Sequence, residues 1–313
     1  MNRICSIDSN RGVATLGGIS VEVPDLTPAV PFFAALGVTA SVDGTQCSVR
    51  TAAQADCMTV RLSPESRPRL RRITFTAPAS EIETIRTRAV EAGRTVIAAS
   101  PASLLMTAPD GVESEVVAWD MPLTAADGPN AIILPHAPLH REIDTPRPLS
   151  LCHAAIFVSS MSEALDFYCG VLGLRVSDRC DGDLVFLHSP HGGDHHILAL
   201  LQSSGPGLHH YSFEMGTIDA IGLRAAYLAR QGYDAGWGMG RHVLGSNFFH
   251  YVRDPWGFHV ELTTGLEQIA ADSDRVPGDH EAEDAFYLWG PPPPSDFIAG
   301  SETLPDGQPL VTA

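Results

Sequence analysis

Short apolar segments that alternate with amphipathic helices recur along the chain, and the order of the first half is repeated in the second. The segments GGISVEVPDLTPAVPFFAALGV, from Gly17, and CHAAIFVSSMSEALDFYCGVLGL, from Cys152, each predict a strand, a turn and a helix closed by glycine. Two later pairs match in the same way: RRITFTAPASEIETIRTRAVEAG with HHYSFEMGTIDAIGLRAAYLARQG, and TAPDGVESEVVAW with RDPWGFHVELTTG. In the second half, Ser162 and Thr217 are the predicted N-caps of the two helices. We therefore interpret the chain as a duplication.

Each half of this duplication contains two βαβββ modules, so the predicted fold class is α+β. We divide the chain into an N-terminal extension (1–13), a first domain (14–120), a linker rich in proline and polar residues (121–148), a second domain (149–266) and a Pro-rich C-terminal arm (267–313). The arm contains four consecutive prolines, which fit neither a helix nor a central strand. We predict that it lies on a surface as polyproline, against this chain or a neighbouring subunit, and we expect a homo-oligomer.

The alternation of side chains sorts three strands of the second half into an apolar and a polar face. On the strand at 208–215 the apolar face, which should pack beneath the helices, contains His209, Tyr211, Phe213 and Met215. His210 is then expected to point into the concave side of the sheet, because neighbours on a strand face opposite ways. The same test on the strands at 152–158 and 258–263 places His153 and Glu261 on the concave side as well.

Two imidazoles and one carboxylate that converge from three strands are a typical metal-binding set. They match the facial triad that holds non-haem Fe(II) and leaves adjacent positions open. Catalytic zinc uses the same set, so the ligand types leave the metal undecided. A single strand histidine is more often a hydrogen-bonded core residue than a ligand, but three coincident inward positions favour a metal site. The matched positions of the first half are Gly18, Arg72 and Glu115, where a lone carboxylate builds no site.

Composition and charge limit the kinds of partner that we expect this protein to bind. The 313 residues are 44% hydrophobic and carry a net charge of −17, so neither nucleic acid nor an anionic membrane surface is an expected partner. No stretch approaches the roughly 20 apolar residues of a membrane span, and the first residues contain no apolar signal region, which predicts a cytoplasmic protein. The 6 cysteines form no tight motif, and we expect no disulfides. Eight of the 13 histidines lie between His153 and His242, which indicates where the chemistry is located.

The motifs LCHAAIFV, DHHILAL, GLHHYSF and GRHVLGSNFFHYVRDPWGFHVEL resemble those of the two-domain type I extradiol ring-cleaving dioxygenases, within the vicinal oxygen chelate superfamily. The resemblance covers about residues 14–265 and implies two open-barrel vicinal oxygen chelate domains, of which only the second, catalytic one holds a metal. It implies Fe(II), with Mn(II) as an alternative, bound by His153, His210 and Glu261. The implied reaction uses O₂ to open a catechol-type ring (a substituted catechol, a biphenyl-diol or a trihydroxylated ring) during aromatic degradation.

The resemblance also implies roles for residues around the metal. His196 would be an acid/base beside the dioxygen position, His242 would reach toward a substrate oxygen, and Tyr251 would hydrogen-bond the bound phenolate. Ala155, on the inward face, would leave space near the substrate ring. Gly245 departs from the pattern, because some biphenyl-cleaving relatives have an aspartate there, and any proton network that relies on this carboxylate is in doubt. The closing Pro-rich segment is similar to tails that cover the site in several relatives.

Two other classes of function stay open. A glyoxalase-like isomerase, or a zinc or manganese hydrolytic relative, usually assembles its site from paired modules, which Gly18 and Arg72 make difficult. A metal-free small-molecule binding module would have no need of the full set His153, His196, His210, His242, Tyr251 and Glu261.

Overall fold

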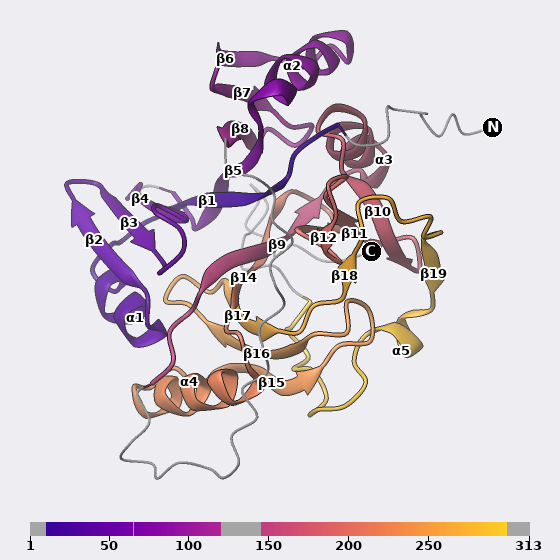
Figure 1. Cartoon of the computed structure of the whole chain (residues 1–313). Coiled ribbons are helices and arrows are strands. Elements are labelled where there is room, and N and C mark those ends of the chain that lie inside the picture. The colour runs from indigo at the N-terminus through magenta and orange to yellow at the C-terminus, as the bar shows by residue number, and fades with distance from the viewer. Residues whose placement is uncertain (1–10, 65, 120–144, 299–313) are drawn as a thin grey trace.

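The structure, a computed structural model, describes residues 11–64, 66–119 and 145–298. Its strands form two large sheets, one from each half of the chain, and the longer helices lie on the outside of these sheets (Figure 1). Most of the predicted N-terminal extension and linker, and the end of the predicted arm, lie outside the described residues. The proposed domain boundaries therefore stay a prediction.

The first half of the chain forms an eight-stranded sheet with the order β2-β3-β4-β1-β5-β8-β7-β6. One module consists of β1 (Thr15–Val23), α1 (Ala29–Leu36), β2 (Thr39–Asp43), β3 (Gln46–Arg50) and β4 (Met58–Leu62). The other consists of β5 (Arg69–Pro78), a 3₁₀ turn (Ala79–Glu81), α2 (Ile82–Glu91), β6 (Val96–Ser100), β7 (Ser103–Thr107) and β8 (Glu113–Trp119). The two modules meet at the antiparallel pair β1 and β5.

The second half forms a nine-stranded sheet with the order β15-β16-β17-β14-β9-β13-β11-β10-β19. Its first module consists of β9 (Ser150–Val158), α3 (Met161–Leu165), a π-helical turn (Asp166–Val171), β10 (Arg175–Cys180), β11 (Leu184–His188), the short β12 (Gly193–Asp194) and β13 (Leu198–Gln202). The second consists of β14 (Gly207–Glu214), α4 (Ile218–Arg230), β15 (Gly236–Arg241), β16 (Phe248–Arg253) and β17 (His259–Thr264). The C-terminal arm adds β18 (Gln268–Ile269), β19 (Gly278–His280) and α5 (Ala282–Ala285).

This element order confirms the predicted α+β fold of tandem βαβββ modules. The predicted N-cap of α4 is also confirmed, because the N–H of Ala220 donates to Oγ1 of Thr217 at 3.1 Å. The N-cap predicted for α3 is wrong. That helix begins at Met161, and its cap is Ser160, whose Oγ accepts from the N–H of Glu163 at 3.4 Å.

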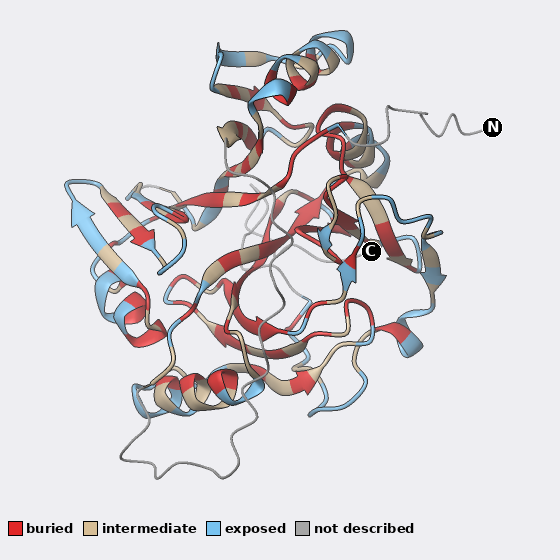
Figure 2. Cartoon of the chain, viewed as in Figure 1, coloured by how far each residue is buried: buried red, intermediate tan, exposed pale blue. Residues whose placement is uncertain are grey.

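The two faces of β9 pack against different surroundings. Ala154, Ile156 and Val158 join the large apolar core, whereas Ala155 and Phe157 belong to a separate cluster on the other face, together with residues of β13. This confirms the predicted division of β9 into two faces. The central strands of the second sheet are buried along most of their length, so polar groups on their inner face are largely shielded from water (Figure 2).

The strand pairing is the same at three matched positions of the two halves. Gly18, Arg72 and Glu115 of the first half correspond to His153, His210 and Glu261 of the second. In the first half the guanidinium of Arg72 lies between two carboxylates, with Nε 2.9 Å from Oε2 of Glu113 and Nη1 3.2 Å from Oε2 of Glu115. Among the described residues, the one group of ligand-type side chains close enough to hold a metal lies in the second half. In the first half the positive charge of the Arg72 side chain thus lies where the second half has its group of possible metal ligands.

Replacing Arg72 by methionine is expected to lower the free energy of unfolding by about 1–3 kcal/mol and to leave the metal content unchanged. The substitution removes the cation that lies between Glu113 and Glu115, so that Glu115 loses its ion pair and Glu113 keeps only the pair with Arg71. Thermal denaturation and metal analysis of both proteins test this. Loss of metal from the variant would contradict the assignment of the metal to the second half alone.

Two other expectations concern the described part of the chain. No helix in it combines the length and the apolar character that are needed to span a bilayer. Its cysteines, Cys47, Cys57, Cys152, Cys169 and Cys180, are all free thiols, while Cys5 lies outside the described residues. The cytoplasmic location and the homo-oligomer stay predictions.

Candidate metal centre and active site

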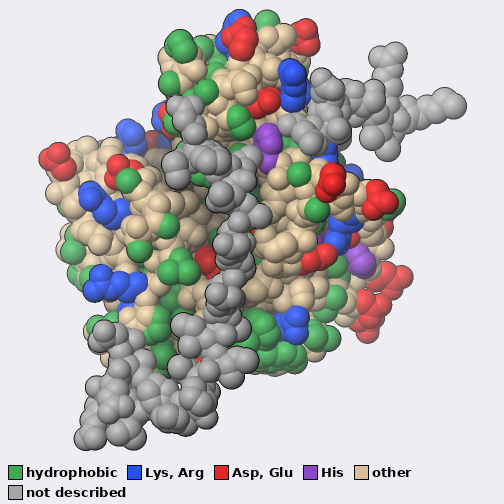
Figure 3. Space-filling view, viewed as in Figure 1, with side chains coloured by type: hydrophobic (Ala, Val, Ile, Leu, Met, Phe, Trp, Pro, Cys, Tyr) green, Lys and Arg blue, Asp and Glu red, His purple; other side chains and the backbone are tan. Residues whose placement is uncertain are grey.

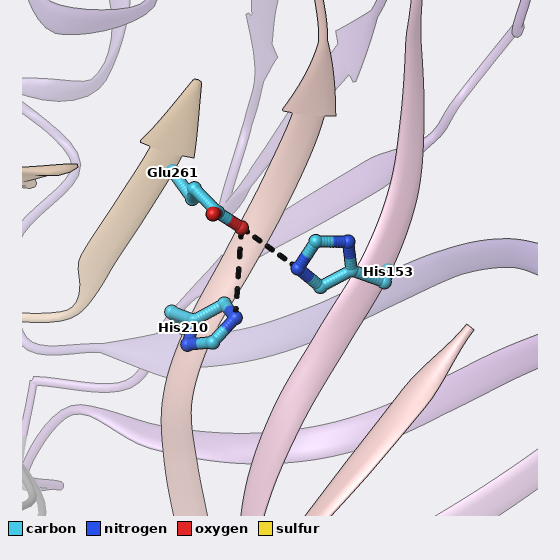
Figure 4. A group of neighbouring side chains, drawn as sticks. All are labelled: His153, His210 and Glu261. Carbon is cyan, nitrogen blue, oxygen red and sulfur yellow. Dashed lines mark ion pairs between the residues drawn. The ribbon is translucent and has the colours of Figure 1, made fainter. Parts of the chain in front are cut away.

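Three neighbouring strands bring His153, His210 and Glu261 together. His153 lies on β9, His210 on β14 and Glu261 on β17, and each offers a ligand atom within 4.8 Å of the others. The side chains point toward one another in Figure 4, with 2.7 Å between Nε2 of His153 and Oε2 of Glu261 and 3.8 Å between Nε2 of His210 and the same oxygen. All three residues are buried. The structure thus places this predicted group as one cluster.

The chemistry of this cluster fits a divalent cation. Nε2 of His210 is buried and has no hydrogen-bond partner within the described residues, and Oε2 of Glu261 is buried against Nε2 of His153. Orphaned buried polar atoms are costly, and a bound ion is a common reason for them. Burial acts to raise the pKa of Glu261, but the charge of His153 and its 2.7 Å contact with the carboxylate outweigh it and hold the pKa well below its usual range. An ionised carboxylate beside two imidazoles is therefore available as a ligand set.

The prediction that His209 packs beneath the helices is wrong. The pairing of β14 with β9 shifts between Leu208 and His210, which is a β-bulge. The extra residue breaks the strict alternation of faces, so both histidines of the pair reach the concave side. His209 lines the cavity described below, and its ring centroid is 5.5 Å from that of Phe157, on the inner face of β9.

His209 instead holds His210 in a defined tautomer. Nε2 of His209 is 2.8 Å from the carbonyl oxygen of Phe297, and Nδ1 of His209 is 2.7 Å from Nδ1 of His210. Since a carbonyl oxygen only accepts, Nε2 of His209 carries the proton and its Nδ1 accepts from the Nδ1–H of His210. The lone pair on Nε2 of His210 then remains free for a metal, an arrangement typical of metal-binding histidines.

His242 and Tyr251 form a polar pair next to the cluster. Nε2 of His242 is 3.1 Å from the hydroxyl oxygen of Tyr251 and 3.7 Å from Oε1 of Glu261. Burial, followed by the charge of Glu261, raises the pKa of Tyr251 well above its usual value, so its hydroxyl stays protonated and can donate. Both predicted residues line the same cavity as the cluster.

At Gly245, where the sequence resemblance would allow an aspartate, the backbone leaves little room for a side chain. Gly245 has a φ of +82°, and a Cβ atom there would lie 3.2 Å from Cε1 of His196 and 3.2 Å from Oδ1 of Asn247. A side chain would therefore press on His196. Asn247, which the sequence analysis missed, donates from Nδ2 to Oε1 of Glu261 at 3.2 Å. A backbone group orients His242, since its Nδ1 is 2.9 Å from the carbonyl oxygen of Phe286.

His196 lies beside the cluster, on the short segment between β12 and β13. Its ring centroid is 4.4 Å from that of His153, and it lines the cavity. Burial, followed by the charge of His153, holds the pKa of His196 well below its usual range, so the imidazole is neutral. Its neighbour His195 is also fully buried, 3.1 Å away between the two Nδ1 atoms.

A cavity of about 320 Å³ lies against the cluster. Ala155, as predicted, contributes to its wall. The remaining wall is mostly apolar and includes Ala199, Leu184, Leu201, Phe186, Leu244, Ala285, Phe286, Phe297 and Ile298. The last four of these belong to the C-terminal arm, which thus covers the cavity of its own chain. The arm is joined to β16 by an ion pair between Nη2 of Arg253 and Oδ2 of Asp296 at 2.8 Å.

The duplicated βαβββ fold, with a His₂Glu cluster in one half, defines a protein of the vicinal oxygen chelate class. The model of the Glyoxalase/Bleomycin resistance protein/Dioxygenase superfamily matches residues 150–262. Over 301 residues, 93% of each chain, the protein is 35% identical to Metapyrocatechase 2 of Cupriavidus necator. The chain belongs to this superfamily and, within it, to the extradiol ring-cleaving dioxygenases.

Solved structures share the fold. The 2,2',3-trihydroxybiphenyl 1,2-dioxygenase of Sphingomonas wittichii has a TM-score of 0.72 at 22% identity, covering 90% of this chain and 100% of that one. The Mn(II)-bound glyoxalase of Novosphingobium aromaticivorans has a TM-score of 0.74 at 24% identity, covering 90% of this chain and 93% of that one. At these identities the likeness shows the fold alone.

Proposed function

We propose that this chain is an Fe(II)-dependent dioxygenase that opens the ring of a neutral catechol-type substrate with O₂. The observation that carries the proposal is the cluster His153, His210 and Glu261 against an apolar cavity of about 320 Å³. The names of two similar proteins, a metapyrocatechase and a trihydroxybiphenyl dioxygenase, support a catechol-type substrate. Mn(II) is the alternative cation, since it also accepts imidazole and carboxylate ligands and is bound by the similar glyoxalase.

The bound metal would supply a positive centre for two adjacent ring oxygens and for O₂. In our proposal His153, His210 and Glu261 hold it, and two neutral imidazoles with one carboxylate leave one positive charge for a substrate monoanion. The Tyr251 hydroxyl and His242, which are 3.1 Å apart, hydrogen-bond a substrate oxygen and fix the position of the ring. His196 exchanges a proton with the reacting oxygens.

The charge of the cavity favours a substrate whose ring substituent is neutral. None of the described residues that line the cavity is a lysine or an arginine, whereas Asp181 and Asp183 are among them. Acidic side chains also gather over α5, which borders the cavity (Figure 3). A carboxylate on the substrate would lose its hydration without gaining a cationic partner, and it would meet like charges.

The proposal predicts that 4-methylcatechol is turned over with a kcat/KM about 100-fold or more above that of 3,4-dihydroxyphenylacetate. The two compounds carry their substituent at the same ring position and differ in charge, so the cost of burying an unpaired carboxylate appears in their ratio. Oxygen uptake and the yellow ring-fission product measure both rates after anaerobic loading with Fe(II). Equal kcat/KM values would contradict the inferred substrate charge.

A wider panel tests the function itself. Catechol, 3-methylcatechol, 2,3-dihydroxybiphenyl and trihydroxylated rings are supplied in air to protein loaded with Fe(II), and in parallel with Mn(II). Oxygen uptake with a coloured product supports ring cleavage, and the more active metal identifies the cofactor. Colourless mixtures with every compound, together with tight binding of a catechol, would instead indicate a small-molecule binding module.

A further inference from the structure

Three buried side chains form a line that leads away from the cavity. His196 lines the cavity, and its Nδ1 is 3.1 Å from Nδ1 of His195. Nε2 of His195 is in turn 2.8 Å from Oδ2 of Asp178 on β10. His195 is 0% exposed and Asp178 is 3% exposed, so water does not compete for these contacts. The proposed ring-cleavage mechanism assigns no role to His195 or Asp178.

Asp178 is surrounded by hydrogen-bond donors from the C-terminal arm. The N–H of Gly278 donates to its Oδ1 at 2.8 Å, the guanidinium of Arg275 donates to its Oδ2, and Nε2 of His280 is 3.4 Å from its Oδ1. Burial alone would raise the pKa of Asp178, but the hydrogen bonds from His195 and Gly278 and the charge of Arg275 outweigh it and hold the pKa well below its usual range. Asp178 is therefore a carboxylate that only accepts hydrogen bonds.

Because Asp178 accepts hydrogen bonds, it determines which ring nitrogens of His195 and His196 carry a proton. Because Asp178 accepts, Nε2 of His195 carries a proton, and a neutral His195 then has a lone pair on Nδ1. That lone pair accepts from the Nδ1–H of His196. Nε2 of His196 is left without a proton. The pair His209 and His210 has the same arrangement, with the carbonyl oxygen of Phe297 in the place of the carboxylate.

We propose that His195 and Asp178 are positioning residues that hold His196 in its Nδ1–H tautomer and fix its ring plane, so that Nε2 presents a hydrogen-bond acceptor to the cavity. The consequence for catalysis rests on the proposed function, whereas the tautomer does not. The opposite tautomer of His196 would present a donor to the bound substrate and could not accept its hydroxyl proton. The sequence contains two pairs of adjacent histidines, His195–His196 and His209–His210. In each pair the second ring faces the metal cluster, and the first ring orients it through a contact between the two Nδ1 atoms.

The tautomer is tested directly by NMR on the full-length protein with ¹⁵N-labelled histidine and no added metal. Long-range ¹⁵N–¹H correlations distinguish protonated from unprotonated ring nitrogens, and the signals that vanish in His195→Asn and in His196→Asn assign the two rings. We expect His196 to be protonated on Nδ1 and His195 on Nε2. Protonation of His196 on Nε2 would overturn the proposal, whether or not any catechol is cleaved.

A pair of variants tests the consequence for turnover. Asparagine at 195 keeps an acceptor near the place of Nδ1, whereas leucine has a similar volume and no acceptor. With the substrate that the wild type turns over best, we expect His195→Leu to lower kcat about 10- to 100-fold with KM and metal content nearly unchanged, and His195→Asn to restore most of kcat. His191→Leu is the matched control, since His191 lies on the same connection and contacts the carbonyl oxygen of Gly12 instead of the site. Equal kcat for the two variants at 195 would show that the acceptor has no role.

Discussion

Replacing His210 by alanine is expected to abolish metal retention, whereas replacing His209 by alanine is expected to weaken metal binding about 10- to 100-fold. His210 supplies a buried Nε2 with no hydrogen-bond partner in the described residues, directed at the carboxylate of Glu261. His209 contributes no ligand atom to the cluster, and it acts on the cluster through its 2.7 Å contact with Nδ1 of His210. Metal content after gel filtration, and titration of the metal-free proteins with Fe(II), measure the two effects.

Asparagine at 209 serves as the control for this comparison. It keeps a hydrogen-bond acceptor close to Nδ1 of His210 but loses the contact with Phe297, so it should bind metal more tightly than the alanine variant. If both alanine substitutions removed the metal completely, His209 would belong to the ligand set, and the tautomer argument for the pair would fail. Activity should follow metal content in all three variants.

The parts of the fold that depend on periodicity could be predicted from the sequence. Strand alternation places the side chains of His153, His210 and Glu261 on one face because each lies on a strand with a clear apolar side. The repeated order of strands and helices fixes the modules for the same reason. Three residues 51 or more positions apart thus meet because neighbouring strands deliver them.

The inward turn of His209 could not be predicted, because a β-bulge adds one residue and alternation contains no sign of it. The contacts of the C-terminal arm were missed for a different reason. His209 and His242 are oriented by the carbonyl oxygens of Phe297 and Phe286, and every residue has such a group. A backbone acceptor therefore leaves no residue-type signature. The arm also supplies three of the donors to Asp178, so its position bears on several histidines at once.

Replacing His196 by leucine is expected to lower kcat about 10²- to 10⁴-fold while the metal stays bound. His196 lies against the ring of His153, with 4.4 Å between the centroids, but it is not one of the three residues of the cluster. Leucine fills much of the same apolar surroundings and removes the only polar atoms of the ring. Metal analysis, kcat at saturating substrate and anaerobic binding of the same catechol measure the three consequences separately.

These three measurements separate a role in chemistry from a role in binding. A residue that exchanges a proton in the reaction affects kcat with little change in metal content or in anaerobic substrate affinity. Leucine at 196 with the kcat of the wild type would remove His196 from the reaction. Loss of metal from the same variant would place His196 among the ligands instead. The fall in kcat should also exceed that of His195→Leu, since a ring that has lost its orienting partner still samples the productive tautomer, whereas leucine at 196 has no proton acceptor.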